Sequence, residues 1–220
     1  MPRGENIAGN YLFMKFGQGV QPQFVNITET HEVFENLNMP GVSISCPIIE
    51  VRNENFVAER TALFQEGKPE KILDMDQTRI LNILENGLSV GYVTTKVDNN
   101  KPVGIRIQKA VGKISLKEKS EDSFICNISI KVAALLEETS DTNYKSEILE
   151  KNFEDVFTEN TLRLMKDLQS NALDPLALQV KYWAKHPEYN FGKDWLTEIY
   201  PKIQFNVTSK VKILQPQILK

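Results

Sequence analysis

The fold of this chain is decided by residues 141–170, DTNYKSEILEKNFEDVFTENTLRLMKDLQS. Apolar residues in this stretch recur at spacings of three and four, which is the period of an α-helix. The residues of this apolar stripe are Leu149, Phe153, Val156, Phe157, Leu164 and Leu168, with Asn160 as its one polar member. Charged residues four apart, such as Glu147 and Lys151, indicate a solvated opposite side. We therefore expect a long amphipathic helix over residues 143–170.

Alternating stretches on both sides of this helix predict β-strands. Residues 124–133 and residues 203–213 each alternate apolar with mostly polar side chains. Period two is the repeat of a strand that buries one face and exposes the other. A sheet with one buried face is typically antiparallel and needs a cover, which the long helix supplies. The sequence therefore predicts an antiparallel sheet packed on the helix, with a final strand at 202–214.

The chain before residue 87 predicts a smaller α+β domain with a helix, three short strands and a second helix. Periodicity and turn residues place these elements at residues 26–38, 42–48, 56–64, 71–73 and 74–86. Pro47 lies inside the first of these strands, which indicates an edge strand or a bulge. Asp74 and Gln77 have the spacing of a capping box at the start of the second helix. The two predicted domains of this α+β chain are residues 1–86 and 87–220.

Two short helical segments are predicted between the long helix and the final strand. Asp174-Pro175 supplies a cap and a first-turn proline for one of them, and residues 194–201, DWLTEIYP, form the other. These segments carry four aromatic residues, Tyr182, Trp183, Trp195 and Tyr200. Two interpretations stay open: the rings pack in the core, or they form a surface that contacts a partner, since tryptophan and tyrosine are enriched at binding hot spots.

Composition and charge exclude several classes of function. The 220 residues are 41% hydrophobic and 25% charged, which is the balance of an ordered protein with a core. The formal net charge is −3 and the sequence holds no dense run of lysine and arginine, so we expect no nucleic-acid partner. No stretch approaches eighteen apolar residues, and residues 1–6 lack the apolar region of a signal peptide. We expect a soluble chain that is either cytosolic or lacks a signal-bearing N-terminal part.

Residues that could carry chemistry are sparse. Cys46 and Cys126 lie in alternating stretches, where we expect buried free thiols, and the sequence alone supports no disulfide between them. His31 and His186 are too few and too far apart for a zinc site. The chain contains none of the common nucleophile, phosphate-loop or zinc-protease motifs. We therefore expect no catalytic residues, no metal and no cofactor.

The segment after the long helix resembles a known family. It contains, in order, Ala172-Leu173-Asp174, Tyr182-Trp183, His186-Pro187, Trp195, Tyr200-Pro201 and the strand at 203–213. This order resembles the C-terminal domain of the C subunit of spore germinant receptors, the Ger(x)C family. Upstream, residues 61–68, TALFQEGK, resemble a hairpin of the same family. The resemblance covers about residues 20–214, with departures at Pro69-Glu70 and in the tail from Leu214.

The resemblance implies a non-catalytic subunit of a spore nutrient-germinant receptor, which acts in receptor assembly and germination signalling. It implies a place on the outer face of the inner spore membrane, with the membrane-embedded A and B subunits as partners. The family attaches to this membrane through a lipid on a cysteine that follows a signal peptide, and we expect that region to be missing from this chain. The alternatives are a small-molecule-binding sensor domain and a small hydrolase on an α+β scaffold.

Overall fold

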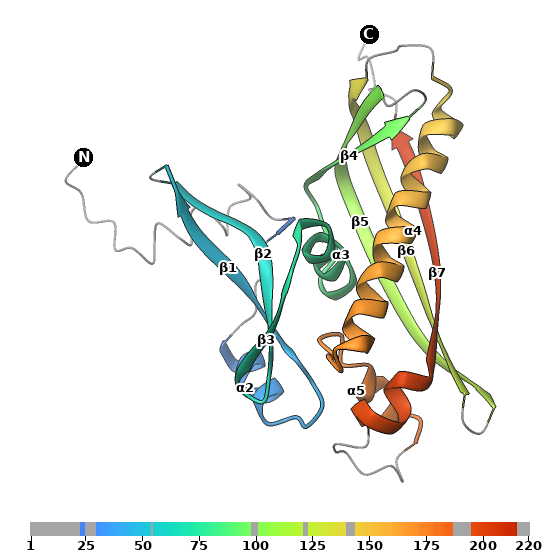
Figure 1. Ribbon diagram of the computed structural model, residues 1–220. Coiled ribbons are helices and arrows are strands. Elements are labelled where there is room, and N and C mark those ends of the chain that lie inside the picture. Colours follow the sequence, from blue (N-terminus) through green and yellow to red (C-terminus); the bar gives the residue numbers. More distant parts are fainter. Residues whose placement is uncertain are drawn as a thin grey trace.

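The computed structural model of the chain describes residues 23–24, 30–53, 55–97, 101–120, 123–139, 144–186 and 195–214. A three-stranded sheet has the order β1 (Ile44–Arg52), β2 (Asn55–Gln65), β3 (Lys68–Leu73). A four-stranded sheet has the order β4 (Gly91–Val97), β5 (Lys101–Ser120), β6 (Ser123–Thr139), β7 (Ile203–Leu214). The helices are α2 (Thr30–Leu37), α3 (Met75–Glu85), α4 (Ser146–Ser170) and α5 (Leu178–Trp183), as Figure 1 shows. This arrangement confirms the α+β class.

The three-stranded sheet follows the sequence prediction closely. Its strands pair antiparallel, and β1 lies at an edge, as Pro47 indicated. The register between β1 and β2 shifts between Ile48 and Ile49, which is the irregularity expected beside that proline. The helix predicted at 26–38 is observed as α2 over Thr30–Leu37, and residues 26–29 of the predicted range lie outside the described residues.

Helix α3 begins and ends as its sequence predicts. Asp74 Oδ1 accepts a hydrogen bond from the Gln77 backbone N–H at 2.8 Å, and Gln77 Oε1 accepts one from the Asp74 backbone N–H at 3.1 Å. These two bonds are the reciprocal pair of a capping box. Gly87, at φ +73°, turns the chain out of the helix in the left-handed conformation that glycine adopts without strain.

Gly112 on β5 lets α3 approach the four-stranded sheet. A Cβ atom at this position would lie 2.9 Å from the Ile83 carbonyl oxygen and 2.9 Å from Leu84 Cα. Backbone atoms cannot yield as a flexible side chain can, so only glycine fits here. The pairing of β5 with β6 has a register shift between Ile107 and Lys109, which leaves Gln108 as an extra residue on β5.

The final strand corrects the prediction of a wholly antiparallel sheet. Strands β4, β5 and β6 pair antiparallel, but β7 pairs with β6 in parallel, from Phe124↔Ile203 to Leu135↔Leu214. Helix α4 returns the chain along the sheet before β7 begins, and parallel neighbours require such a crossover. Alternation carries no information on strand direction, whereas a long helix between two strands favours the parallel arrangement.

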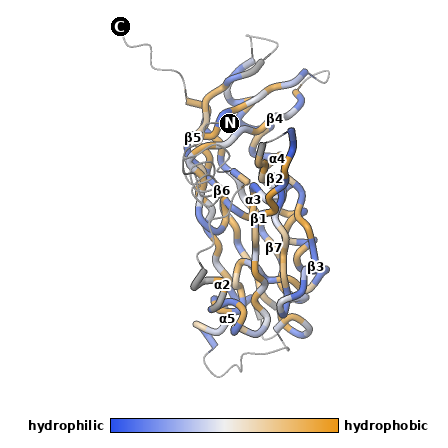
Figure 2. Tube along the Cα trace, turned by 90° about the vertical axis from the view of Figure 1, so that its left-hand side faces the viewer, coloured by the Kyte–Doolittle hydropathy of each residue, from blue (hydrophilic) through white to orange (hydrophobic). Residues whose placement is uncertain are grey.

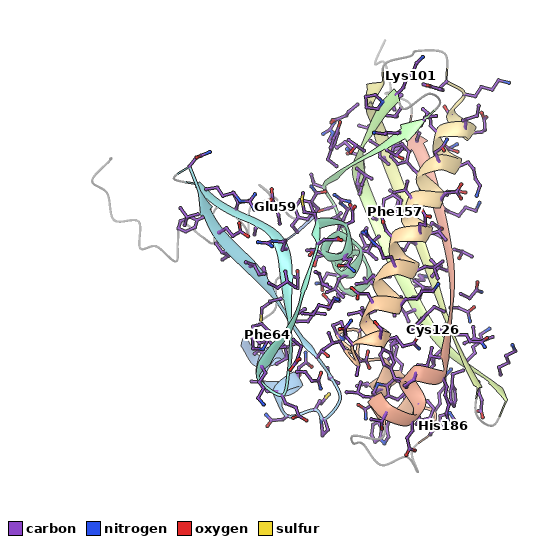
Figure 3. The ribbon with its side chains drawn as sticks, in the orientation of Figure 1. Glu59, Phe64, Lys101, Cys126, Phe157 and His186 are labelled. Carbon is purple, nitrogen blue, oxygen red and sulfur yellow. The ribbon has the colours of Figure 1, made fainter. Side chains whose placement is uncertain are left out.

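Helix α4 covers the apolar face of the four-stranded sheet, and its apolar stripe is buried as predicted. Leu149, Phe153, Phe157, Leu164 and Leu168 are at most 2% exposed, and Phe157 is labelled on α4 in Figure 3. The hydropathy colours of Figure 2 follow the alternation along the strands. The helix begins at Ser146, three residues later than predicted.

The same helix protects the outer edge of β7. Glu150 Oε1 accepts a hydrogen bond from the Ile213 backbone N–H at 2.9 Å, and Glu154 Oε1 accepts one from the Val211 N–H at 3.4 Å. An open strand edge presents unpaired backbone groups that invite association with other strands. Two carboxylates one helical turn apart occupy part of this edge.

Polar contacts join the three-stranded sheet to α4. Lys71 Nζ on β3 lies 2.7 Å from Asp167 Oδ1, and Gln77 Nε2 on α3 donates to Asp167 Oδ2 at 2.7 Å. Helix α3, which the predicted boundary at residue 86 assigns to the first domain, also packs on α4 and β5. The division into residues 1–86 and 87–220 stays a prediction.

Candidate interaction surface around the C-terminal aromatic cluster

The four predicted contact residues lie on two neighbouring segments, α5 and the turn at residues 195–202. This turn consists of a short π-helix, Trp195–Ile199, and a 3-10 helical turn, Tyr200–Lys202. The ring centroids of Tyr182 and Trp195 are 5.5 Å apart, and those of Trp195 and Tyr200 are 5.8 Å apart. The structure therefore brings three of the four rings into one row, which we call the aromatic cluster.

Burial separates the four residues into core and surface. Trp195 and Tyr200 are 0% exposed. Trp195 Nε1 donates to Asp174 Oδ2 at 3.1 Å, and the Tyr200 hydroxyl donates to the Leu173 carbonyl oxygen at 2.9 Å. For these two residues, core packing is the correct interpretation, and a surface contact is wrong. Trp183, at 42% exposed, can present its ring to a partner.

Tyr182 and His186 extend the cluster toward the surface. Their rings stack with centroids 4.4 Å apart, and Tyr182 meets Phe124 of β6 edge to face at 5.2 Å. Such ring pairs contribute about 0.5–1.5 kcal/mol beyond their buried area. Figure 3 shows His186 at the end of the molecule formed by α5 and the 195–202 turn. These ring contacts hold α5 in place, and α5 carries Trp183.

Asp174 lies beneath the cluster and is 0% exposed. Its carboxylate accepts hydrogen bonds from the Leu178 and Gln179 backbone N–H groups, each at 2.9 Å, in addition to the one from Trp195. The helix begins at Leu178 with Ala177 as its N-cap residue, so the prediction of Asp174 as the cap and Pro175 in the first turn is wrong. The Asp174 carboxylate instead accepts from the first two N–H groups of the helix from three residues before the N-cap. Burial raises the pKa of Asp174 to about 6, against the lowering effect of these hydrogen bonds.

Asp174 also joins the aromatic cluster to the chain that enters β1. Its backbone N–H donates to Ser43 Oγ at 2.9 Å, and its carbonyl oxygen accepts from the Ser43 N–H at 3.2 Å. Ser43 is 1% exposed. Sequence reasoning missed Ser43, because a lone serine within a predicted strand gives no signal of a partner 131 residues away.

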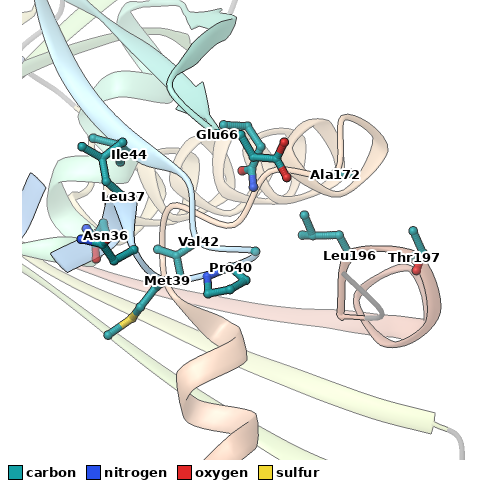
Figure 4. Close-up of a pocket in the computed structure, with 13 residues that line it drawn as sticks. Asn36, Leu37, Met39, Pro40, Val42, Ile44, Glu66, Ala172, Leu196 and Thr197 are labelled. Carbon is teal, nitrogen blue, oxygen red and sulfur yellow. The ribbon is translucent and has the colours of Figure 1, made fainter. Parts of the chain in front are cut away.

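A pocket of about 560 Å³ lies beside this junction. Four segments line it, as Figure 4 shows: residues 36–42 with Ile44, the β2–β3 turn at residues 65–66, Ala172, and Leu196 with Thr197. The lining is mostly apolar, and Glu66 is its one titratable residue among the described parts of the chain. Behind Gly41, the buried Gln179 amide has no hydrogen-bond partner within those parts. No sequence signal pointed to this pocket.

The two cysteines are free thiols, as predicted, but only Cys126 is fully buried and Cys46 is half-buried. Burial raises the pKa of Cys126 to about 12. Across the described ranges, no three histidine, cysteine, aspartate or glutamate side chains are grouped so that they could hold a metal ion. No helix in those ranges is both long and apolar enough to cross a membrane.

Comparison with known proteins assigns the family. Residues 59–217 match the family described as spore germination B3/GerAC like, C-terminal. This match covers more than half of the chain, so the chain belongs to this family, the Ger(x)C family of spore germinant receptor C subunits. No curated protein shows significant sequence similarity to the chain.

A solved structure has the same fold. The crystal structure of the GerBC protein superposes with a TM-score of 0.68 at 21% sequence identity. The superposition covers 84% of this chain and 59% of the GerBC chain, so this chain spans about three fifths of that protein's length. Similarity at this level of identity shows the fold and no more than the fold.

Proposed function

We propose that this chain is a non-catalytic subunit of a spore nutrient-germinant receptor and acts in receptor assembly and germination signalling. The observation that carries the proposal is the family match over residues 59–217. The proposed location is the outer face of the inner spore membrane, and the proposed partners are the membrane-embedded A and B subunits. Attachment through a lipid anchor belongs to the same proposal.

The proposed contact surface centres on Trp183, with Tyr182 beside it. Trp183 is 42% exposed, and α5 is held from below by the Asp174 hydrogen bonds and by the Tyr182–Trp195 ring contact. An exposed tryptophan on a rigid base loses little conformational freedom on binding, which suits a hot spot. The subunit would transmit a signal through this contact, with no bond made or broken.

A pull-down tests this proposal. The tagged chain is incubated with detergent-solubilised inner spore membranes, and bound proteins are identified by mass spectrometry. We expect the multi-span receptor subunits to be recovered, and Trp183→Ala to reduce their recovery at least about tenfold. The matched control is Ile148→Ala, because Ile148 is exposed to a similar extent (45%) on another helix. Recovery of no membrane subunit would contradict the assembly role.

The pocket supports a second candidate function, that of a small-molecule sensor domain. Its volume lies within the usual range for ligand sites, and Glu66 supplies one anionic group on an apolar wall. A small apolar amine fits this chemistry. Thermal-shift measurements with such amines should raise the melting temperature of the wild type and not that of Met39→Trp, which fills the pocket. An equal shift in both proteins, or a shift in neither, would contradict the sensor function.

A further inference from the structure

The register of the four-stranded sheet gathers lysines that are dispersed in the sequence. On the face opposite α4, Lys131 of β6 pairs with Val111 of β5 on one side and with Lys210 of β7 on the other. The neighbouring register rows add further lysines on the same face. The exposed lysines of this face are Lys109, Lys113, Lys117, Lys131, Lys210 and Lys212. We call this set the lysine face.

The lysine face contains no carboxylate of its own. Five register rows across β5, β6 and β7, from Lys117–Ile125–Gln204 to Lys109–Ala133–Lys212, hold lysine, uncharged polar and apolar residues only. Within the described ranges, two of the six lysines form ion pairs: Lys210 lies 3.4 Å from Glu154, and Lys212 lies 3.2 Å from Glu150. Both of these lysines stay more than 70% exposed.

The opposite layer of the molecule has the reverse charge. Helix α4 carries six acidic and three basic residues, on the other side of the same sheet. The acidic residues of α4 are Glu147, Glu150, Glu154, Asp155, Glu159 and Asp167. A chain with a formal net charge of −3 therefore has one strongly positive side. Near a negatively charged plane, this asymmetry orients the molecule with the lysine face toward the plane.

We propose that the lysine face binds the surface of an anionic phospholipid bilayer by electrostatic attraction. The lysines spread over about 10 Å across the strands and about 27 Å along them, from strand spacing and rise. A two-dimensional array of exposed ammonium groups suits a plane of negatively charged headgroups, where each lysine contributes a similar attraction. The proposal concerns the protein surface itself and is independent of any lipid anchor.

The composition of the face favours a membrane over a protein or a nucleic acid. Protein interfaces are depleted in lysine and rely on aromatic and arginine hot spots, whereas the five rows contain neither arginine nor an aromatic ring. Single-stranded nucleic acids are bound with the help of aromatic stacking, for which this face offers no ring. A plane of lipid headgroups can be bound by electrostatic attraction that is spread over a surface, and this binding needs no specific pocket.

Vesicle co-sedimentation tests the proposal. The wild type is mixed with vesicles of phosphatidylcholine alone or of an equal mixture of phosphatidylcholine and phosphatidylglycerol. We expect binding to the anionic vesicles only, and its loss at about 0.5 M NaCl, where screening shortens the range of the attraction. A soluble glycerophosphoglycerol at matched phosphate concentration should not compete, because an isolated headgroup cannot engage the whole array.

The variant Lys109→Gln/Lys113→Gln/Lys131→Gln should weaken vesicle binding at least about tenfold. The matched control, Lys68→Gln/Lys145→Gln/Lys166→Gln, removes the same charge from exposed lysines elsewhere and should bind nearly as the wild type does. Circular dichroism confirms that both variants fold. Equal losses in the two variants, salt-insensitive binding, or binding of duplex DNA without binding of vesicles would overturn the proposal. The vesicle assay and the pull-down of receptor subunits are independent experiments, so either proposal can be rejected while the other stands.

Discussion

The two sheets of this molecule are held in different ways. The four-stranded sheet buries an apolar face beneath α4, with Val103, Ile105, Ile107, Ile128 and Ile130 all at most 1% exposed. The three-stranded sheet contributes fewer residues to the core, among them Leu63 and Leu73, both 0% exposed, and leaves other apolar side chains open to solvent. Its exposed apolar residues include Ile49 at 45%, Val51 at 69% and Ile72 at 56%.

Polar contacts add to the attachment of the three-stranded sheet, which buries fewer apolar side chains. The three-stranded sheet is fixed to the rest of the molecule through Lys71 and Asp167, and through the Ser43–Asp174 contact at the entry to β1. A hydrogen bond contributes about 1 kcal/mol, whereas a buried aromatic ring contributes several times as much. We therefore expect the four-stranded sheet to form the stable core. Substitution of the residues that form the polar contacts should weaken the packing of the three-stranded sheet on the rest of the molecule.

Removal of a ring beneath α4 should have the largest effect on stability. We expect Phe153→Ala to lower the free energy of unfolding by about 3–5 kcal/mol, because Phe153 is 0% exposed and the site cannot collapse fully. Urea denaturation monitored by circular dichroism measures this change. The matched control is Ile148→Ala on the same helix, 45% exposed, which should change stability far less. Similar losses in both variants would contradict the assignment of the core to this interface.

Asp174→Ala should come next, because it leaves the Leu178 and Gln179 backbone N–H groups and Trp195 Nε1 without their acceptor. We expect a loss of about 2–4 kcal/mol. The loss should depend on pH. With a folded-state pKa near 6 and an ordinary value of 3.8 when unfolded, folded wild type holds the extra proton between these values. Its stability therefore falls as pH rises from about 4 to 6.

The difference between wild type and Asp174→Ala should thus be larger at pH 4 than at pH 7. Denaturation at a series of pH values measures it, with Asp155→Ala on the exposed side of α4 as the control. A difference that grows with rising pH would contradict the raised pKa of Asp174.

We expect Lys71→Met to weaken the contact between the three-stranded sheet and α4 by about 1 kcal/mol of stability, because it removes the ion pair with Asp167, in which both side chains are about a quarter exposed. Burial raises the pKa of Asp167, but hydrogen bonds from Lys71 and Gln77 outweigh it, so the pKa lies below its ordinary value. The stabilisation is therefore present above about pH 4 and is lost as pH falls through the lowered folded-state pKa. Hydrogen exchange of β3 amides, compared with those of β6, should show faster exchange confined to the smaller sheet.

Arg52→Gln should have the smallest effect. Arg52 pairs with Glu50 and Glu59 at 2.8 and 2.7 Å, but the cluster lies on the exposed surface of the three-stranded sheet, where solvent screens it. We expect an unchanged melting temperature by calorimetry. A clear fall would mean that surface ion pairs hold this sheet more firmly than the polar contacts do.

Local signals in the sequence predicted most elements of the fold. The apolar stripe of α4 is buried, and the Asp74–Gln77 capping box starts α3 where expected. These features depend on neighbours within a few residues, so spacing alone reveals them. The resemblance that rested on residues 172–213 also led to the correct family.

Features that depend on contacts between distant residues could not be predicted. The parallel direction of β7 leaves its alternation unchanged, and the partner of Asp174 is a serine 131 residues earlier. The lysine face arises only when Lys113, Lys131 and Lys210 are placed in register on three strands. The sequence alone does not show which of Trp183 and Trp195 lies on the surface. The difference comes from tertiary packing, which buries Trp195 and leaves Trp183 partly exposed.

The parallel pairing of β7 has a consequence for synthesis of the chain. During translation, β5, β6 and α4 leave the ribosome before residues 203–214, so the apolar stripe of α4 first meets an incomplete sheet. Pairing of β6 with β7 joins residues separated by 79 positions, and contacts of such long range form late in folding. Until the last strand arrives, Glu150 and Glu154 have no strand edge to bind. A ribosome that stalls before residue 203 would therefore present to chaperones and proteases the open edge of β6 and the apolar residues of α4 that β7 covers in the complete fold.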